Sequence, residues 1–232
     1  MPDEIHICYH EETVLPAVAQ EYLAALLAGN REQAYQVIRE ALRAGLTIRD
    51  LYLTIFQPVQ YEVGRLWIIN KVSIAVEHFC TAATQSLMLE LYSEIISSHR
   101  SGTKLVSACV GTELHELGIR MVTDFFEMDG WDTWYIGCAV SNEQLIAAIE
   151  ERKPDMVALS ATMSYHVPKV QELIHAIKQA FPQQTPYLMV GGMPFNAAPE
   201  LWRTVGADLW AINADQAVQA AHDLVRAGQN YE

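Results

Sequence analysis

Residues 105–121 read LVSACVGTELHELGIRM, and this stretch decides the fold. A short apolar run over 105–110 ends at Gly111, and apolar residues then recur at helical spacing up to position 121. This pattern predicts a buried strand that enters a helix through a tight turn. In open α/β sheets, ligands bind outside the carboxyl ends of the strands. Three residues of this turn are therefore expected at a binding crevice: Glu113, His115 and Gly118.

His115 is the candidate metal ligand of this turn. One nitrogen of a neutral imidazole binds a soft or borderline metal, while the other N–H needs an acceptor that orients the ring. Glu113 stands two residues earlier and can supply that acceptor, and Gly118 lacks a side chain where a large, flat ligand would approach the main chain. The alternative is that Glu113 caps the helix and that His115 is an ordinary surface histidine.

The composition predicts a globular, cytoplasmic protein with two modest domains. Its 232 residues are 51% hydrophobic, which is enough for two cores. A net charge of −13 with only 15 Lys and Arg argues against direct nucleic-acid binding. Four widely spaced cysteines indicate reduced thiols rather than disulfides or a zinc site. We find no leader-like N-terminus and no membrane-spanning apolar run, so no membrane association is expected.

The first domain, residues 1–100, carries the spacing of four helices. Apolar residues recur at helical intervals over 12–28, 31–44, 47–67 and 72–98. Gly45 is suited to end the second helix, and Thr47 to Asp50 resembles a capping box that opens the third. Pro58 must bend or interrupt that third helix. Short joints between the segments predict an antiparallel four-helix bundle.

The fourth predicted helix carries a polar strip that a simple core does not need. Glu77 and His78 begin the strip and Thr81 continues it on the next turn, with the apolar Ile74 beside them. The strip either lines a pocket or is a solvated face. Trp67 lies ten residues before Glu77 and either closes the same pocket or fills the core.

The hydrophobic period changes near residue 100, where a polar linker precedes a second domain of residues 101–232. Strand-like runs cover 104–110, 133–136, 156–159, 187–190 and 208–212. Helical patterns alternate with them over 113–128, 142–151, 168–180, 197–204 and 215–227. These five strand–helix units predict a doubly wound, flavodoxin-like (Rossmann-like) parallel sheet of five strands. The expected fold class is therefore α/β with an all-α N-terminal domain.

Two further strand ends carry residues that suit a ligand. Ser160 and Thr162 follow the third strand and place two hydroxyl groups at its carboxyl end. Gly191 and Gly192 follow the fourth strand, where paired glycines let a ligand lie against the main chain. Hydroxyl groups after a strand also serve as helix caps, and Gly-Gly also forms turns. Together with His115, three loops at one edge of the sheet carry ligand-compatible groups.

In combination these motifs resemble a known family. Glu113-x-His115-x-x-Gly118, Ser160-x-Thr162 and Gly191-Gly192 are similar to the motifs of cobalamin (vitamin B12)-binding Rossmann-like domains, and the helical half resembles their bundle cap. The resemblance covers residues 12–228. It implies that His115 is the lower axial ligand of cobalt and that Glu113 is its hydrogen-bond partner. The slot for the displaced dimethylbenzimidazole tail would be lined by Ser160, Thr162, Gly191 and Gly192.

A second set of residues resembles the light-sensing region of CarH-type adenosylcobalamin photoreceptors. Trp67, followed after nine residues by Glu77-His78, is similar to the Trp-x9-Glu-His signature of that region. The resemblance implies that Trp67 packs on the adenosyl group or corrin, that Glu77 bonds the adenosyl group with support from His78, and that Ile74 also contacts the cofactor. We expect no MerR-type DNA-binding module. Ile68 replaces a histidine that in some relatives captures cobalt after illumination.

These resemblances imply a sensory protein that is not an enzyme. Adenosylcobalamin is the expected cofactor, with methylcobalamin and hydroxocobalamin as other forms, and loss of the adenosyl group in light would rearrange the bundle. The signal would pass to a partner protein, and a homo-oligomer could change with the cofactor state. Sensing of cobalamin itself would use the same pocket.

Two other classes of function compete with the light sensor. A corrinoid methyl carrier of a methyltransferase system usually continues Asp-x-His-Asp-Ile-Gly-Lys-Asn, whereas Ile119-Arg120 follows Gly118 here, which counts against methyl transfer. A flavodoxin-like module without any corrinoid would leave His115 and the Gly-Gly motif as coincidences.

Overall fold

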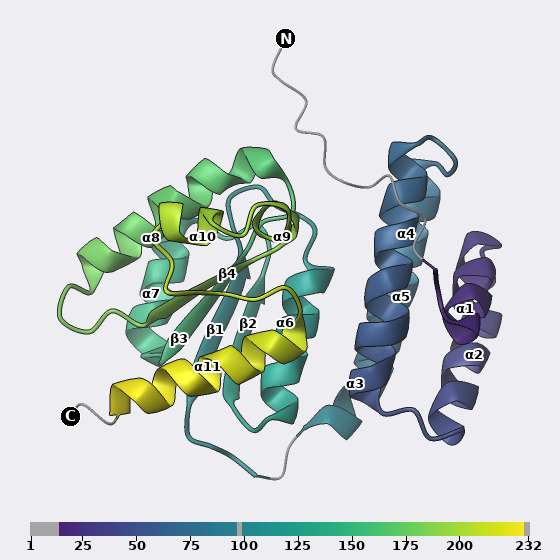
Figure 1. The fold of residues 1–232 in the computed structure, drawn as a ribbon, viewed down its shortest axis with the longest axis horizontal. Coiled ribbons are helices and arrows are strands. Elements are labelled where there is room, and N and C mark those ends of the chain that lie inside the picture. The colour runs from purple at the N-terminus through teal and green to yellow at the C-terminus, as the bar shows by residue number, and fades with distance from the viewer. Residues whose placement is uncertain (1–13, 97–98, 230–232) are drawn as a thin grey trace. The chain divides into compact units, whose positions relative to one another are not determined.

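The computed structural model describes residues 14–96 and 99–229, and the chain divides into a helical unit that ends at Ile95 and an α/β unit that begins at Ile96 (Figure 1). The predicted start of the first helix at 12–13 and the predicted end of the fourth at 97–98 lie outside the described residues. Among the described residues, no helix combines the length and the apolar character that crossing a membrane requires.

The helical unit is all-helical, as predicted. Asn30 caps α2 by accepting from the main-chain N–H of Gln33 at 3.0 Å, and the capping box of Thr47 and Asp50 opens α3 as the sequence indicated. The chain continues from α3 through a π-helical turn into α4, and Pro58 lies in the first turn of α4, where its missing N–H costs least. The elements are α1 (Ala17–Leu27), α2 (Arg31–Arg43), α3 (Ile48–Leu51), the π turn (Tyr52–Phe56), α4 (Gln57–Ile68) and α5 (Ile74–Ile95).

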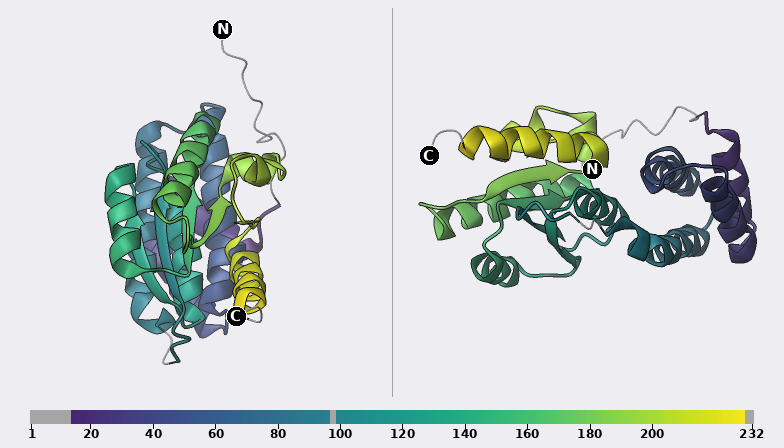
Figure 2. Two further views of the ribbon diagram at one scale, coloured as in Figure 1. Left: turned by 90° about the vertical axis from the view of Figure 1, so that its left-hand side faces the viewer. Right: turned by 90° about the horizontal axis from the view of Figure 1, so that it is seen from below.

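The α/β unit contains a five-stranded parallel sheet in the order β2-β1-β3-β4-β5, which confirms the flavodoxin-like prediction. Helices α6 and α11 pack together, and α7 packs with α8, on opposite faces of the sheet (Figure 2). The strands are β1 (Lys104–Cys109), β2 (Asp132–Gly137), β3 (Met156–Ser160), β4 (Tyr187–Gly191) and β5 (Leu209–Trp210). The helices are α6 (Leu117–Met128), α7 (Asn142–Arg152), α8 (Val167–Ala180), α9 (Met193–Ala197), α10 (Leu201–Thr204) and α11 (Ala214–Gln229).

The largest differences in extent concern three predicted elements of this unit, of which the last strand, predicted over 208–212, covers only Leu209–Trp210. The helix predicted over 197–204 shares only Ala197 with α9 and is otherwise reduced to α10, because Ala198 precedes Pro199 and adopts a non-helical backbone, with φ −136° and ψ 82°. The helix predicted from residue 113 begins only at Leu117. The four residues before it form a turn whose main-chain N–H groups have partners other than the helix.

Gly192 allows the loop after β4 to approach the loop after β3. Its φ is +108°, and a β-carbon at this position would lie 2.1 Å from the main-chain oxygen of Ala161. The main-chain N–H of Ala161 in turn donates to the oxygen of Gly191 at 3.1 Å. Only glycine satisfies both the backbone angle and the close approach.

Replacing Gly192 by alanine should destabilise the protein by about 3 kcal/mol, since backbone strain and a steric clash add together. Gly45 is the matched control: its φ is +100°, but a β-carbon there would meet nothing within 4 Å. Gly45→Ala should therefore cost only the backbone term, about 1 kcal/mol. Urea unfolding measures both, and equal losses would contradict the role of the close approach.

Candidate cofactor site

The carboxylate of Glu113 joins the loop after β1 to the loop after β3. Its Oε1 accepts from the main-chain N–H groups of the next two residues, each at 3.0 Å, and from Nδ1 of His115. Its Oε2 accepts from the main-chain N–H groups of Thr162 at 2.7 Å and Met163 at 3.1 Å. Nδ1 of His166 also lies 3.1 Å from Oε2. The side chain is fully buried, so every lone pair of the carboxylate faces a protein donor.

These hydrogen bonds decide the charge of Glu113. Burial by itself raises the pKa of a carboxyl group, because the charged form loses its hydration. The hydrogen bonds from His115, Thr162 and Met163 favour the charged form more strongly, so the pKa of Glu113 is held well below its usual range. An ionised carboxylate therefore sits at the centre of the two loops.

His115 presents its imidazole on the surface side of this carboxylate. The side chain is 51% exposed, although its partner Glu113 has no exposure. Since Nδ1 donates to the carboxylate, the neutral ring carries its lone pair on Nε2, which is the atom suited to a metal. Glu113 is not the helix cap, because Glu116 occupies that position in α6. The hydrogen bond that the spacing of Glu113 and His115 allowed is thus present.

The surroundings of His115 fit a large, flat, mostly apolar ligand. A β-carbon at Gly118 or at Gly191 would meet no atom of the described residues within 4 Å, apart from their immediate chain surroundings, so there is open space beside these two positions. Exposed apolar side chains stand on the loops after three strands of the same edge: Leu114 after β1, Tyr165 after β3 and Ile212 after β5. Apolar side chains at these positions favour contact with a large ring over contact with water.

The chemistry of the donors also fits a metal that arrives within a macrocycle. Within residues 14–96 and 99–229, no three His, Cys, Asp or Glu side chains form a set of metal ligands. A corrin ring supplies the equatorial ligands of its cobalt, so one imidazole from the protein is sufficient. His115 meets that requirement.

The residues predicted for the tail slot come together at the ends of β3 and β4. Ser160 is buried and lies opposite Gly191 in the parallel register of the two strands. Gly192 contacts the segment that directly follows Ser160. The main-chain N–H of Thr162 donates to Glu113, a contact that the sequence did not indicate. The four residues thus share one small region beside His115, and their role in binding the tail stays a prediction.

Sequence reasoning missed His166. Its ring is buried, with Nδ1 facing Glu113 and Nε2 lying 3.2 Å from the hydroxyl oxygen of Thr112. Because Nδ1 must donate to the carboxylate, the neutral ring accepts at Nε2 from Thr112. The available signal was a histidine in the same loop as Ser160 and Thr162, at the strand end already marked as a ligand site.

The predicted site residues of the helical unit lie around the turn between α4 and α5. Trp67 is 38% exposed, so it does not fill the core, and Ile74 is exposed as well. Glu77 Oε2 and His78 Nδ1 are 2.6 Å apart, and His78 is 72% exposed whereas Glu77 is 17% exposed. The imidazole is therefore the outer member of the pair, and the contacts of Glu77 and His78 with a cofactor stay a prediction.

The polar strip of α5 is not a solvated face along its inner part. The hydroxyl of Thr81 lies 3.1 Å from Glu77 Oε1 and 3.0 Å from Gln60 Oε1 on α4. The amide of Gln60 donates to the hydroxyl of Thr84 at 2.8 Å, and Thr84 is bonded to Tyr22 on α1 at 2.8 Å. These contacts connect Glu77, and through it the exposed His78, to the centre of the bundle.

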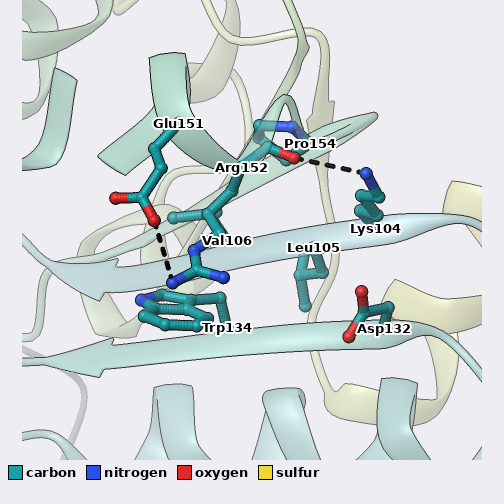
Figure 3. Close-up of a pocket in the computed structure, with 8 residues that line it drawn as sticks. All are labelled: Lys104, Leu105, Val106, Asp132, Trp134, Glu151, Arg152 and Pro154. Carbon is teal, nitrogen blue, oxygen red and sulfur yellow. Dashed lines mark hydrogen bonds and ion pairs between the residues drawn. The ribbon is translucent and has the colours of Figure 1, made fainter. Parts of the chain in front are cut away.

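A separate pocket of about 230 Å³ lies at the other end of the sheet (Figure 3). Lys104 and Asp132, which begin β1 and β2, line it together with Trp134. The guanidinium of Arg152 lies 3.2 Å from the centre of the Trp134 ring and pairs with Glu151 at 3.1 Å. Because the strands are parallel, this pocket is at their amino ends, away from His115.

Comparison with known proteins identifies the family. A family model described as the B12 binding domain matches residues 103–221, about half of the chain, and a second model with the same description matches residues 18–92. The chain belongs to the B12-binding family. Cobalamin or corrinoid binding, expected from the motifs around His115, is thereby supported for this protein.

Relatives of this B12-binding protein are corrinoid proteins. Dimethylamine corrinoid protein 1 of Methanosarcina acetivorans is 29% identical over 168 residues, covering 72% of this chain and 76% of that protein. A corrinoid protein of Desulfitobacterium hafniense (strain Y51) is 27% identical over 217 residues, covering 91% and 99%. The monomethylamine corrinoid protein of Methanosarcina barkeri shares the fold, with a TM-score of 0.79 at 20% identity over 89% of this chain and 98% of that one. These relatives give no support to the photoreceptor resemblance.

Replacing Glu113 by glutamine should destabilise the B12-binding unit by about 3 kcal/mol, because an amide NH₂ would face donors that a carboxylate accepts. Urea unfolding followed by tryptophan fluorescence suits the measurement, as four of the five tryptophans lie beyond residue 100. Glu151→Gln, at an exposed ion pair, is the control and should cost almost nothing. A Glu113→Gln variant as stable as this control would refute the central role of the carboxylate.

Gly118→Ala should separate stability from cofactor binding. The position is helical and open, so alanine should leave the cofactor-free protein as stable as before or slightly more stable. The added methyl group would occupy space that we assign to the corrinoid, so titration with hydroxocobalamin should show weaker binding by about tenfold, equivalent to about 1.4 kcal/mol. Undiminished affinity would remove Gly118 from the site.

Proposed function

We propose that this protein is a corrinoid carrier of a methyltransferase system, which passes a methyl group between partner proteins. The Glu113–His115 pair at the carboxyl end of β1, in a chain of the B12-binding family, carries the corrinoid-binding part of the proposal. The dimethylamine corrinoid protein among its relatives supports methyl transfer over light sensing. The light-sensing function expected from Trp67, Glu77 and His78 becomes the competing outcome of the test below.

In this proposal the protein supplies binding and orientation. The bound corrinoid supplies a cobalt ion that accepts and releases a methyl group. His115 would hold the cobalt through Nε2, and the hydrogen bond from Nδ1 to Glu113 keeps the imidazole in the tautomer and direction that this requires. Residues at the ends of β3 and β4 would hold the tail. The proposed contacts to the tail and to the rest of the cofactor come from Ser160, Thr162, Gly191, Gly192 and Gly118. The cofactor contacts expected from the resemblance for Trp67, Ile74, Glu77 and His78 of the helical unit stay predictions.

The departure from the usual carrier motif after Gly118 has a structural explanation. Ile119 is buried, and Arg120 donates from Nε to Asp124 at 3.1 Å while its guanidinium lies 5.1 Å from the centre of the Tyr135 ring. These contacts serve the packing of α6. They leave the Glu113–His115 pair intact, so the altered residues do not count against the carrier function.

The proposal assigns catalysis to the partners rather than to this chain. A carrier needs one protein that donates the methyl group and another that accepts it, and the chain is accordingly not proposed as an enzyme. Cys80, Cys109 and Cys138 are free thiols, which suits the reducing cytoplasm expected from the sequence. The expected dependence of a homo-oligomer on the cofactor state stays a prediction.

A methylation cycle tests the carrier function. The full chain is loaded with hydroxocobalamin, reduced with titanium(III) citrate and treated with methyl iodide in the dark. A carrier should take up about one methyl group per bound corrinoid, seen as the absorption change from the reduced to the methylated cofactor. His115→Ala should lose the axial nitrogen splitting in the EPR spectrum of the cobalt(II) form. His175→Ala, an exposed histidine on α8, is the control and should keep that splitting.

A second preparation, loaded with a different form of the cofactor, distinguishes the carrier from the light sensor. The chain loaded with adenosylcobalamin is run on a size-exclusion column before and after illumination. A carrier should elute at the same volume in both states. A light-dependent change in size that adenosylcobalamin produces and methylcobalamin does not would overturn the carrier proposal in favour of the sensor.

A further inference from the structure

A second glutamate anchors the turn that carries His115. Glu116 follows the imidazole directly in the chain, and its Oε2 accepts a hydrogen bond from the hydroxyl of Tyr135 at 3.0 Å. Tyr135 belongs to β2, the strand next to β1 in the sheet. A β-carbon at Gly137 would lie 3.1 Å from Glu116 Oε2 and 3.3 Å from the Tyr135 hydroxyl. Glycine at 137 therefore keeps room for this contact.

The surroundings of Tyr135 make it a fixed donor. Burial raises the pKa of its phenol, and the negative charge of Glu116 raises it further, so the hydroxyl keeps its proton. The guanidinium of Arg120, one helical turn after Glu116, lies over the Tyr135 ring at 5.1 Å. One residue of β2 thus contacts two side chains on the first turn of α6, on either side of Gly118 in the sequence.

The two glutamates hold the turn from opposite directions. β1 lies between β2 and β3 in the sheet. Glu113 bonds to the loop after β3, whereas Glu116 bonds to β2. The thiol of Cys109, the last residue of β1, also lies 3.9 Å from the main-chain oxygen of His115. Glu113 sets the direction of the imidazole ring, and the Tyr135–Glu116 contact is the restraint on the opposite side of its backbone.

We propose that Tyr135 is a positioning residue for the cobalt ligand His115, acting through Glu116. This inference rests on the proposed corrinoid role of His115 and adds to it a residue from a neighbouring strand. A residue that orients a metal ligand typically changes metal affinity by about 10- to 100-fold when it is removed. A residue needed only for packing would lower stability and leave the coordination of cobalt unchanged.

The test compares Tyr135→Phe with the wild-type chain, each loaded with cobalamin and reduced to the cobalt(II) form. Tyr135→Phe keeps the ring below Arg120 and removes only the hydroxyl. We expect the EPR spectrum to change from a uniform axial-nitrogen splitting to a mixture with a large unligated fraction, and hydroxocobalamin affinity to fall by about tenfold. Glu116→Gln keeps an oxygen that can accept from Tyr135 and should retain most of the wild-type splitting.

A double-mutant cycle assigns the effect to the contact itself. Glu116→Ala should reproduce the spectrum of Tyr135→Phe, and the double variant should lose no more affinity than either single one. Thr123→Val is the control for stability. It removes a buried hydroxyl on the same helix, bonded at 2.7 Å to Ser107 on β1, and should lower the melting temperature without altering the cobalt spectrum.

The outcomes separate this inference from the proposed function. Nitrogen splitting in the wild type together with an unchanged spectrum and affinity in Tyr135→Phe would overturn the inference alone, and so would a Thr123→Val spectrum as altered as that of Tyr135→Phe. Absence of nitrogen splitting in the wild type would overturn the assignment of His115 as ligand and the inference with it. Loss of splitting in Tyr135→Phe, with Thr123→Val normal, would support both.

Discussion

The candidate site depends on one buried carboxylate. An ionised group without any exposure is tolerated only when its lone pairs are satisfied, and Glu113 meets four main-chain N–H groups and two imidazoles. These donors come from two loops that are about fifty residues apart in the chain. The buried charge therefore holds the two loops together. The direction of the His115 ring follows from the need of this carboxylate for hydrogen-bond donors.

The position of this carboxylate follows from the topology of the sheet. The chain leaves β1 towards α6 on one face and leaves β3 towards α8 on the other, so the two loops diverge at the point where a doubly wound sheet opens a crevice. Without a connection, divergent loops would leave His115 poorly fixed. Glu113 spans this divergence, and His166 adds a third contact from the β3 side. These hydrogen bonds therefore connect the two loops at the place where the fold opens.

The sequence predicted those parts of the structure that depend on local pattern. Apolar runs identified all five strands. The capping box at Thr47 could also be predicted, because its partners are three residues apart. Features that depend on partners distant in the sequence could not be predicted. The start of α6 was misplaced because the N–H groups after Glu113 bond to its side chain instead of continuing a helix, and His166 was missed because its partner lies 53 residues away.

The division of the chain into two units bears on the choice of function. The family-level chemistry, a histidine directed by a buried glutamate, lies in the α/β unit, and a carrier and a sensor need it equally. Residues that could distinguish the two lie in the helical unit, where the exposed His78 is bonded to Glu77 and Glu77 is linked through Thr81 to the interior. A carrier needs an upper cofactor face that a methyl group and its acceptor can reach, whereas a sensor needs side chains that hold the upper ligand until it is lost. A test of His115 therefore addresses cobalt binding alone, and the behaviour of the bound upper ligand decides between the carrier and the sensor.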